Sequence, residues 1–283
     1  KSKSRIYLLD SQTYSPETIA VAFAKTSRSP ESFDLIAAEL TEQKSAEFNE
    51  KWVVGYGHSS VAEHAVLHIA IENVSRLAVE NLESNRLASY TEKSTRYQTW
   101  ESGAYHTPVE LEGSKYLDAY TDLCNQLFDL YARLIPRVSE VVALNCAPKD
   151  GESESSWKRR VQSTAVDSCR FVLPAASIAN VGMTINARVL EHAISKMLSS
   201  GLAEVRSMGA EIKAVAQNSV PTLVKYANAN PYPGNIETQV QDLPRGETIE
   251  ALDWCQLVDH TPEVQTLMLA AILYRYRNFA YTQ

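Results

Sequence analysis

Residues 65–71 read Ala-Val-Leu-His-Ile-Ala-Ile, with apolar side chains at the alternate positions Leu67, Ile69 and Ile71. A period of two is typical of a strand that buries one face, so this stretch predicts a β-strand. Two further strands are expected, over residues 5–10 and 178–185. The fold is therefore expected to contain strands as well as helices.

Much of the remaining chain has apolar residues at the three- and four-residue spacing of amphipathic helices. Ser15 followed by Pro16 predicts an N-cap and the first residue of a helix, and Pro136 is expected to end a long amphipathic helix. Helices are expected over residues 18–25, 33–40, 45–54, 75–82, 114–134, 156–170, 187–198 and 203–226, with Thr261-Pro262-Glu263 capping a final one. Helices interspersed with strands indicate an α+β domain over residues 1–227, and the Pro-rich stretch after it predicts a linker and a helical extension over residues 228–283.

The composition is ordinary for a soluble chain: 283 residues, 45% of them hydrophobic and 22% charged. No stretch approaches the roughly 20 apolar residues that span a bilayer, so we expect no membrane contact. The net charge of −7 argues against nucleic-acid binding, which usually uses a basic face. Four widely spaced cysteines without a Cys-x-x-Cys pair favour neither a disulfide framework nor a cysteine zinc site, so a reducing cytoplasm is expected.

Three polar clusters could carry chemistry. The first, residues 57–64, reads Gly-His-Ser-Ser-Val-Ala-Glu-His and is followed by His68. His64 and His68 fall in a strand pattern, where residues four apart do not share a helical face, so we expect no metal site. Hydrogen bonds that hold a turn explain His58 and Glu63 at least as well as ligand contact does on spacing alone.

The second cluster is the Ser-, Thr- and Arg-rich segment from Arg86 to Arg96. Its hydroxyl and guanidinium groups suit phosphate oxygens, although a solvated polar loop has the same composition. The third cluster combines residues 170–174, Arg-Phe-Val-Leu-Pro, with residues 186–188, Asn-Ala-Arg, beside a predicted strand. Buried arginines that pair with acidic residues would produce the same sequence pattern. Composition and period leave both alternatives open.

Taken together, the three clusters resemble the flavin-dependent thymidylate synthases, the ThyX family, over most of the chain. Residues 57–66 are similar to the family's H-x-[ST]-x-x-E-H segment and the strand after it. Residues 86–97 resemble the later part of its R-H-R-x₇-S signature and the Arg-Tyr that follows. Residues 170–174 are similar to its R-x-V-L-P segment, and residues 186–188 to its N-x-R segment. Four matches in the same order are far more specific than any one of them.

The resemblance implies helices packed around a twisted, mostly antiparallel sheet, a homotetramer, and FAD bound between subunits. It also implies reductive methylation of dUMP to dTMP, with methylenetetrahydrofolate as the carbon donor and NADPH as the reductant. No side chain is a required covalent nucleophile in that chemistry, which fits the lack of a convincing Cys–His or Ser–His pair here. Carried over by position, FAD would bind His58, Ser60, Glu63, Arg86, Asn186, Arg188 and His192, and the nucleotide would bind Asn81, Ser94, Arg96 and Arg170.

The chain departs from the family pattern in its most charged segment. Where the family signature opens Arg-His-Arg, this chain has Ser84, Asn85 and Arg86, and a Gln of the family is replaced by the shorter Asn81. Charge-assisted hydrogen bonds contribute about 1.5–3 kcal/mol each. Losing two of them without replacement would weaken ligand binding by roughly 10²–10⁴.

A further cationic residue of the family polarises the uracil ring. Two reference points in the family pattern give different positions for this residue. Counting forward from Asn186, in the N-x-R segment, places it at Met197, whereas counting back from Arg206 places it at Lys196. Lysine would keep the positive charge without the planar guanidinium group. We therefore take Lys196 and Arg96 as the predicted catalytic residues and keep Met197 as the alternative to Lys196.

Two other functions are alternatives to thymidylate synthesis. The donors missing at three positions fit a degenerate module with a structural or regulatory role, such as the first half of a tandem protein whose second copy follows Gln283. Weaker phosphate contacts would instead suit a flavoenzyme that acts on another nucleotide or on a nucleoside. Bound FAD in the purified protein is the observation that tests the altered segment most directly.

Overall fold

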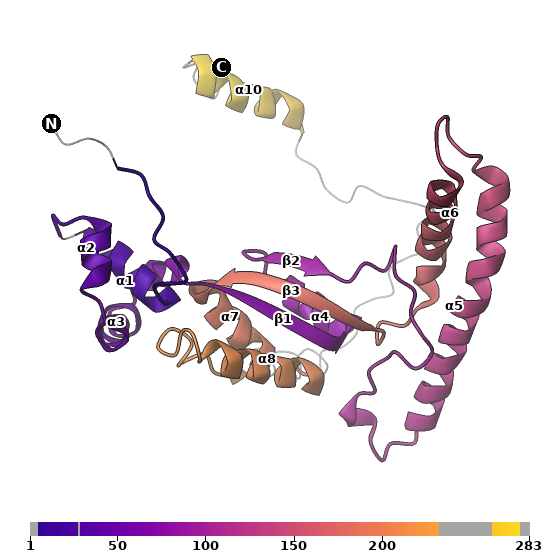
Figure 1. The fold of residues 1–283 in the computed structure, drawn as a ribbon, viewed down its shortest axis with the longest axis horizontal. Coiled ribbons are helices and arrows are strands. Elements are labelled where there is room, and N and C mark those ends of the chain that lie inside the picture. The colour runs from indigo at the N-terminus through magenta and orange to yellow at the C-terminus, as the bar shows by residue number, and fades with distance from the viewer. Residues whose placement is uncertain (1–4, 28, 232–261, 278–283) are drawn as a thin grey trace. The chain divides into compact units, whose positions relative to one another are not determined.

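The computed structural model describes residues 5–27, 29–231 and 262–277 and shows two compact units, Lys1–Gln239 and Val240–Gln283 (Figure 1). The second unit contains the described helix α10 (Val264–Arg277), within the helical extension expected there. Thr261, the first residue of the predicted cap, and most of the predicted linker lie outside the described residues. The domain boundary at residue 227 therefore stays a prediction.

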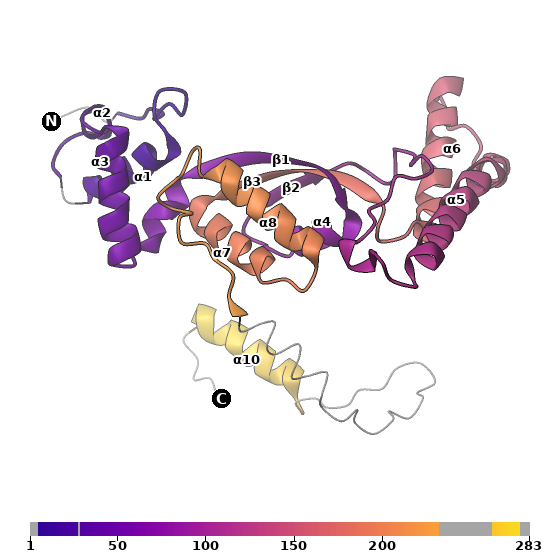
Figure 2. The same cartoon turned by 90° about the horizontal axis from the view of Figure 1, so that it is seen from below.

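A three-stranded antiparallel sheet lies at the centre of the first unit (Figures 1 and 2). Its order is β1-β3-β2, with β1 at Val66–Ser75, β3 at Ile178–Asn186 and β2 at Ser89–Glu92. Leu67, Ile69 and Ile71 of β1 are all buried, as their alternation predicts. Ile69 pairs with Met183 of β3, which is also buried, so the register brings the apolar faces of both strands to one core. The predicted α+β class is confirmed.

Three helices cover the buried face of the sheet: α4 (Arg76–Glu83), α7 (Ala187–Leu198) and α8 (Ala203–Ala216) (Figure 2). Helices α7 and α8 come into close contact at Gly209, where a Cβ atom would lie 2.7 Å from the Cβ of Met197. Met197 is fully buried. On the opposite face of the sheet, Val66, His68 and Gly182 are exposed. The core thus determines which side of α7 points inward and which side is left for a ligand.

The N-terminal region is helical. It consists of α1 (Pro16–Thr26), α2 (Phe33–Ala38), α3 (Glu42–Asn49), a π-helical turn at Glu50–Gly55 and the 3₁₀ helix η2 at Ser59–His64. Ser15 caps α1 as predicted, since its Oγ accepts the Thr18 N–H at 3.3 Å. Buried Glu17 accepts the N–H groups of Thr222 at 2.9 Å and Leu223 at 3.2 Å, and burial raises the pKa of Glu17. These bonds tie α1 to the segment that follows α8.

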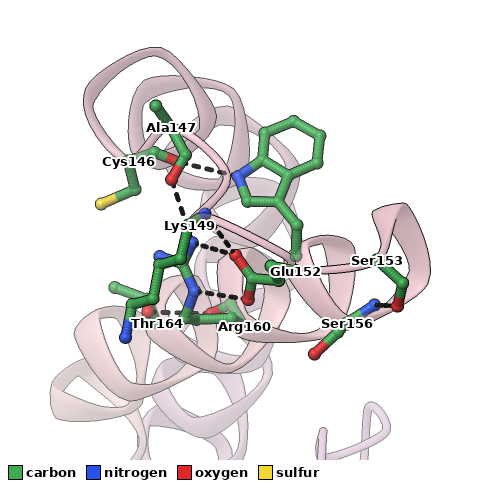
Figure 3. A network of polar contacts seen from close by, with 9 residues as sticks. Cys146, Ala147, Lys149, Glu152, Ser153, Ser156, Arg160 and Thr164 are labelled. Carbon is green, nitrogen blue, oxygen red and sulfur yellow. Dashed lines mark hydrogen bonds and ion pairs between the residues drawn. The ribbon is translucent and has the colours of Figure 1, made fainter.

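A helical hairpin is formed by α5 (Leu117–Asn145), which follows a short 3₁₀ turn at Val109–Leu111, and α6 (Glu154–Cys169). Figure 3 shows the polar contacts at its turn, where Arg160 Nε and Nη2 lie 3.0 and 2.7 Å from the two carboxylate oxygens of Glu152. Glu152 also accepts the Lys149 N–H at 2.9 Å, and Arg160 donates to the Ala147 carbonyl at 3.1 Å. The hydrogen bonds from Arg160 and then Lys149 lower the pKa of Glu152 to about 2. This ion pair fixes the start of α6, whose other end leads into the 3₁₀ turn Arg170–Val172.

The strand predicted over residues 5–10 does not form, and this prediction was wrong. A strand needs a neighbour to satisfy its backbone groups, and none of the described strands pairs with this segment. Ile6 and Leu8 are 98% and 93% exposed. Arg5 Nη2 and Tyr7 Oη instead bond to the Asp34 carboxylate at 2.7 and 3.1 Å.

Two helices end far from the positions predicted for them. The helix expected to stop at Pro136 continues to Asn145, because proline removes one backbone hydrogen bond and the packing of α5 on α6 outweighs that loss. The helix expected over residues 203–226 ends at Ala216, and the chain then turns around Pro221, whose ring is incompatible with a continuing helix. The polar segment 86–96 is not only a loop, since it contributes β2.

Candidate functional site

Helix α7 carries three of the predicted site residues on one face. Arg188, His192 and Lys196 lie four residues apart and all three are exposed. The helix begins at Asn186, whose Oδ1 accepts the Val189 N–H at 3.0 Å, so this predicted cofactor-binding residue serves as the N-cap. We call Arg188, His192 and Lys196 the α7 stripe. It is a row of basic or titratable groups open to solvent.

One end of the α7 stripe meets the histidine-containing segment that precedes β1. Arg188 forms an ion pair with Glu63, and the two side chains are 49% and 48% exposed. Glu63 lines a cavity of about 670 Å³ together with His58 and Ser60. Three predicted cofactor-binding residues of one segment therefore share a cavity, and one of them, Glu63, is paired with a fourth, Arg188. We call it the η2 cavity, since Ser60 and Glu63 belong to η2.

Aromatic rings form part of the wall of the η2 cavity. Phe23 of α1 stacks on His64 with ring centroids 4.8 Å apart, and both line the cavity. Trp52 also lines it and stacks on Tyr56 with centroids 5.0 Å apart. Small-molecule sites of about 300–1,000 Å³ typically combine such rings with a few charged groups. The cavity therefore suits a planar ligand that also carries polar groups.

The other end of the α7 stripe reaches the end of α4. Lys196 Nζ lies 2.5 Å from Ser84 Oγ, which itself donates to the Asn81 carbonyl at 2.6 Å. The neighbouring Met197 is fully buried in the core. Of the two residues that counting left open, only Lys196 is presented to solvent.

The altered segment after α4 is partly used for structure. Asn85 is 7% exposed, and its Nδ2 donates to the Leu82 carbonyl at 2.8 Å. Tyr90 Oη donates to the carbonyls of Leu82 at 3.1 Å and Asn85 at 2.9 Å. Arg86 is exposed and has no ion-pair partner in the described part of the chain. Arg86 therefore carries the available positive charge of this segment.

A second group of predicted site residues lies where the loop after β2 meets the end of α6. Arg170 Nε lies 2.9 Å, and Arg96 Nε 3.5 Å, from the same Oδ1 atom of Asp167. Arg170 also donates to the Thr95 hydroxyl at 3.0 Å, and Ser94 Oγ accepts the Arg96 N–H at 3.3 Å. We call Ser94, Thr95, Arg96, Asp167 and Arg170 the anion cluster.

A cavity of about 440 Å³ opens beside the anion cluster. Thr95 and Arg170 line it, together with Trp100, Arg76 and Glu80. Arg76 is paired with Glu92 of β2 and thus already has a carboxylate partner. Positive charge around this cavity is largely balanced by carboxylates of the chain itself.

The structure gathers the predicted residues into two groups. One group consists of the α7 stripe and the predicted residues near η2 and the end of α4. The other group is the anion cluster, near the end of α6. No hydrogen bond or ion pair links the two groups within the residues that the structure describes. Sequence analysis missed Asp167, although a residue three positions before Arg170 on a predicted helix shares its face. It also missed the rings of Phe23 and Trp52.

Metal-ligand types do not converge in the described ranges: no three His, Cys, Asp or Glu side chains there could hold an ion. His68 Nδ1 lies 2.8 Å from Thr184 Oγ1 on the open face of the sheet. The described cysteines Cys124, Cys146 and Cys169 are free thiols, and Cys255 lies outside the described residues. No helix in the described ranges is long and apolar enough to cross a membrane.

The likeness to known proteins extends over most of the chain. Residues 8–222 match the family model described as thymidylate synthase complementing protein. The chain belongs to this family, which is the ThyX family. The site residues described above all lie within the matched residues.

Individual ThyX relatives support the assignment. The chain is 25% identical over 225 residues to a flavin-dependent thymidylate synthase of Clostridium tetani, covering 79% of this chain and 86% of the relative. A crystal structure of the flavin-dependent thymidylate synthase ThyX of Helicobacter pylori, complexed with FAD and dUMP, superposes with a TM-score of 0.51 at 18% identity. That match covers 77% of this chain and 97% of the other, and it shows a shared ThyX fold.

Longer relatives also match. The chain is 33% identical over 202 residues to a UPF0159 protein of Chlamydia muridarum, covering 69% of this chain and 38% of the relative. A UPF0159 protein of Thermoplasma acidophilum is 28% identical over 214 residues, covering 66% of this chain and 43% of the relative. The chain thus aligns to less than half the length of these two relatives.

Proposed function

We propose that the chain is a flavin-dependent thymidylate synthase module that binds FAD and dUMP. Its reaction is the reductive methylation of dUMP to dTMP, with methylenetetrahydrofolate as carbon donor and NADPH as reductant. The observation that carries the proposal is the grouping of the family's motif residues into an α7 stripe beside a ring-lined cavity and a separate two-arginine cluster.

The residues around the η2 cavity fit the parts of FAD. Phe23, Trp52 and His64 offer ring faces for the isoalloxazine or adenine, and Lys25 on the same wall offers a cation for the pyrophosphate. Bound FAD would supply the reducing equivalents. The residues that would hold it are His58, Ser60, Glu63, Arg86, Asn186, Arg188 and His192.

Lys196 is proposed as the cation that polarises the pyrimidine ring. An ammonium group close to the ring carbonyl would stabilise the negative charge that develops when the ring carbon reacts. Ser84 Oγ, 2.5 Å from Lys196 Nζ, holds the ammonium at the end of α4. Asn81, whose carbonyl accepts from Ser84, is proposed to contact the nucleotide beside it.

The anion cluster is proposed to hold the phosphate or the uracil of the nucleotide. Arg170 presents its guanidinium to a cavity, and the adjacent Arg96 and Ser94 add a second guanidinium and a hydroxyl. Arg96 is proposed as a catalytic residue because it would touch the substrate. Since no hydrogen bond or ion pair joins the two groups in the part of the chain that the structure describes, a site completed between subunits of a cytoplasmic homotetramer is part of the proposal.

The proposal is tested by the colour and chemistry of the purified protein. We expect a yellow protein that releases FAD on denaturation and, once reduced, removes the C5 hydrogen of dUMP, measured as tritium release from [5-³H]dUMP. A matched control is Arg188→Ala, which should lose FAD while keeping the fold by circular dichroism. A colourless protein that cannot be loaded with FAD would refute the cofactor assignment, and retained C5 tritium in a loaded protein would refute the activity.

A second function is favoured by the altered segment itself. Asn85 is buried in the end of α4, and the UPF0159 relatives are more than twice as long as the stretch that they share with this chain. Both facts suit a degenerate module that completes another module's site. Such a module should be colourless when it is purified alone. Its Arg170→Ala variant should nevertheless lower the activity of a longer protein that contains the module. A flavoenzyme for nucleosides would instead be stabilised against heat by deoxyuridine as strongly as by dUMP.

A further inference from the structure

Asp167 stands at the centre of the anion cluster. Its Oδ1 atom lies 2.9 Å from Arg170 Nε and 3.5 Å from Arg96 Nε, so one carboxylate oxygen serves two guanidinium groups. Arg170 is 28% exposed, Arg96 62% and Asp167 46%. The Asp167 side chain as a whole is thus half-exposed, whereas its Oδ1 atom is buried against the two guanidinium groups, where a bound anion would make the same contacts.

We propose that Asp167 is an internal competitor that occupies the anion site until a phosphate displaces it. The inference rests on the proposed function, because it takes Arg96 and Arg170 as the groups that receive the nucleotide phosphate. It assigns Asp167 a role in specificity: the residue sets how much negative charge a ligand must carry to enter the cluster.

The charges explain why a carboxylate lies here. Two guanidinium groups that share a site repel each other, and one carboxylate between them removes most of that repulsion. A phosphate monoester carries about −1.5 to −2 charges and three acceptor oxygens, whereas Asp167 carries one charge and uses one oxygen for both arginines. Only a ligand of greater charge gains from the exchange. A neutral nucleoside gains nothing from it.

The surroundings allow the exchange to happen without refolding. Asp167 lies in the last turn of α6, and its side chain is already half-exposed, so a rotation of the carboxylate away from the arginines leads toward solvent. The other contact of Arg170, from Nη1 to the Thr95 hydroxyl at 3.0 Å, does not involve Asp167 and would keep the guanidinium in place. The nearby cation Arg76 is held by Glu92 and is not released by the same movement.

The test is the affinity of Asp167→Asn for anions, measured by isothermal titration calorimetry at constant ionic strength. We expect the variant to bind both inorganic phosphate and dUMP roughly three- to tenfold more tightly than the unaltered chain, and deoxyuridine with unchanged affinity. Asp167→Glu, which retains the carboxylate, should bind phosphate as weakly as the unaltered chain. Asp129→Asn on α5 removes the same charge from an exposed position outside both groups and should change nothing.

Each outcome either supports or overturns the role proposed for Asp167. Unchanged or weaker phosphate binding by Asp167→Asn, with an unaltered circular dichroism spectrum, would overturn the proposal and make Asp167 a residue that positions the two arginines. An equal gain for Asp129→Asn would also overturn it, because the effect would then be one of net charge. The phosphate measurement needs neither FAD nor turnover, so a failure of the thymidylate synthase proposal is distinguishable from a failure of this one.

Discussion

The α7 stripe and the anion cluster use positive charge in different ways. Lys196 of the stripe contacts a hydroxyl and has no carboxylate partner in the described residues, so its ammonium group is available to a ligand. In the anion cluster both guanidinium groups share the Asp167 carboxylate. A motif match therefore locates a cation but does not tell whether the cation is available to a ligand.

The largest effect is expected from Lys196→Ala. If the free ammonium polarises the pyrimidine, its loss should lower kcat for tritium release from [5-³H]dUMP by roughly 10²–10³ while FAD content stays constant. Lys196→Arg, which retains the charge, should recover part of the rate. Lys158→Ala on α6, an exposed lysine outside both groups, serves as the control. Full activity in Lys196→Ala would show that the stripe does not supply the charge.

Arginine deletions should separate the two groups. Arg188→Ala should reduce FAD affinity, and Arg170→Ala should reduce dUMP affinity, each by roughly 10- to 150-fold, the worth of one charge-assisted hydrogen bond. FAD is measured by flavin fluorescence quenching and dUMP by calorimetry. Neither variant should affect the other ligand by more than about threefold. Equal losses of both ligands in both variants would mean that the two groups form one site.

The sequence predicted β1, β3 and α7 well because those signals are local, whereas β2 was not predicted. Alternation at Leu67, Ile69 and Ile71 identified β1, and α7 has the predicted bounds. The strand at residues 5–10 failed because a strand depends on a distant partner that periodicity does not reveal. The choice between Lys196 and Met197 could have been made from the spacing of the apolar residues of α7. Met197 continues the apolar face of that helix and Lys196 does not, but this spacing was not used.

The sequence predicted which residues belong to the candidate site, but not how these residues are arranged in space. The motifs named Arg96 and Arg170, and the structure brings them together. Their shared partner Asp167 belongs to no motif and was not predicted, although its place three residues before Arg170 puts both on one face of a predicted helix; its contact with Arg96 follows from the packing of the loop after β2 against α6. Asn85 is the opposite case, because it lies in a motif but serves the structure. It is buried at the end of α4 and donates to the Leu82 carbonyl, and the polar composition of the segment did not predict this burial.

A moderate effect on stability is expected where α7 is held by α8. In Gly209→Ala the added Cβ would lie 2.7 Å from the Cβ of Met197, an overlap that costs about 1–3 kcal/mol against a gain of up to about 1 kcal/mol in helix propensity. Tm should fall by a few degrees, and Lys196 should be displaced with α7, lowering activity. Gly182→Ala, whose Cβ would lie 3.9 Å from the Thr91 carbonyl, is the matched control. An unchanged Tm for Gly209→Ala would show that α7 and α8 can separate freely.

The smallest effect is expected from the ion pair at the other end of the stripe. Glu63 and Arg188 are each about half exposed, so their coupling free energy in a double-mutant cycle of Glu63→Gln and Arg188→Gln should be only about 0.2–1 kcal/mol. It should shrink further in 0.5 M salt, because exposed charges are screened. This weak coupling is what leaves Arg188 available to a ligand, in contrast to Arg170. A coupling above about 2 kcal/mol that resists salt would instead mean that Glu63 holds Arg188 away from a ligand, and the contrast between the two groups would not stand.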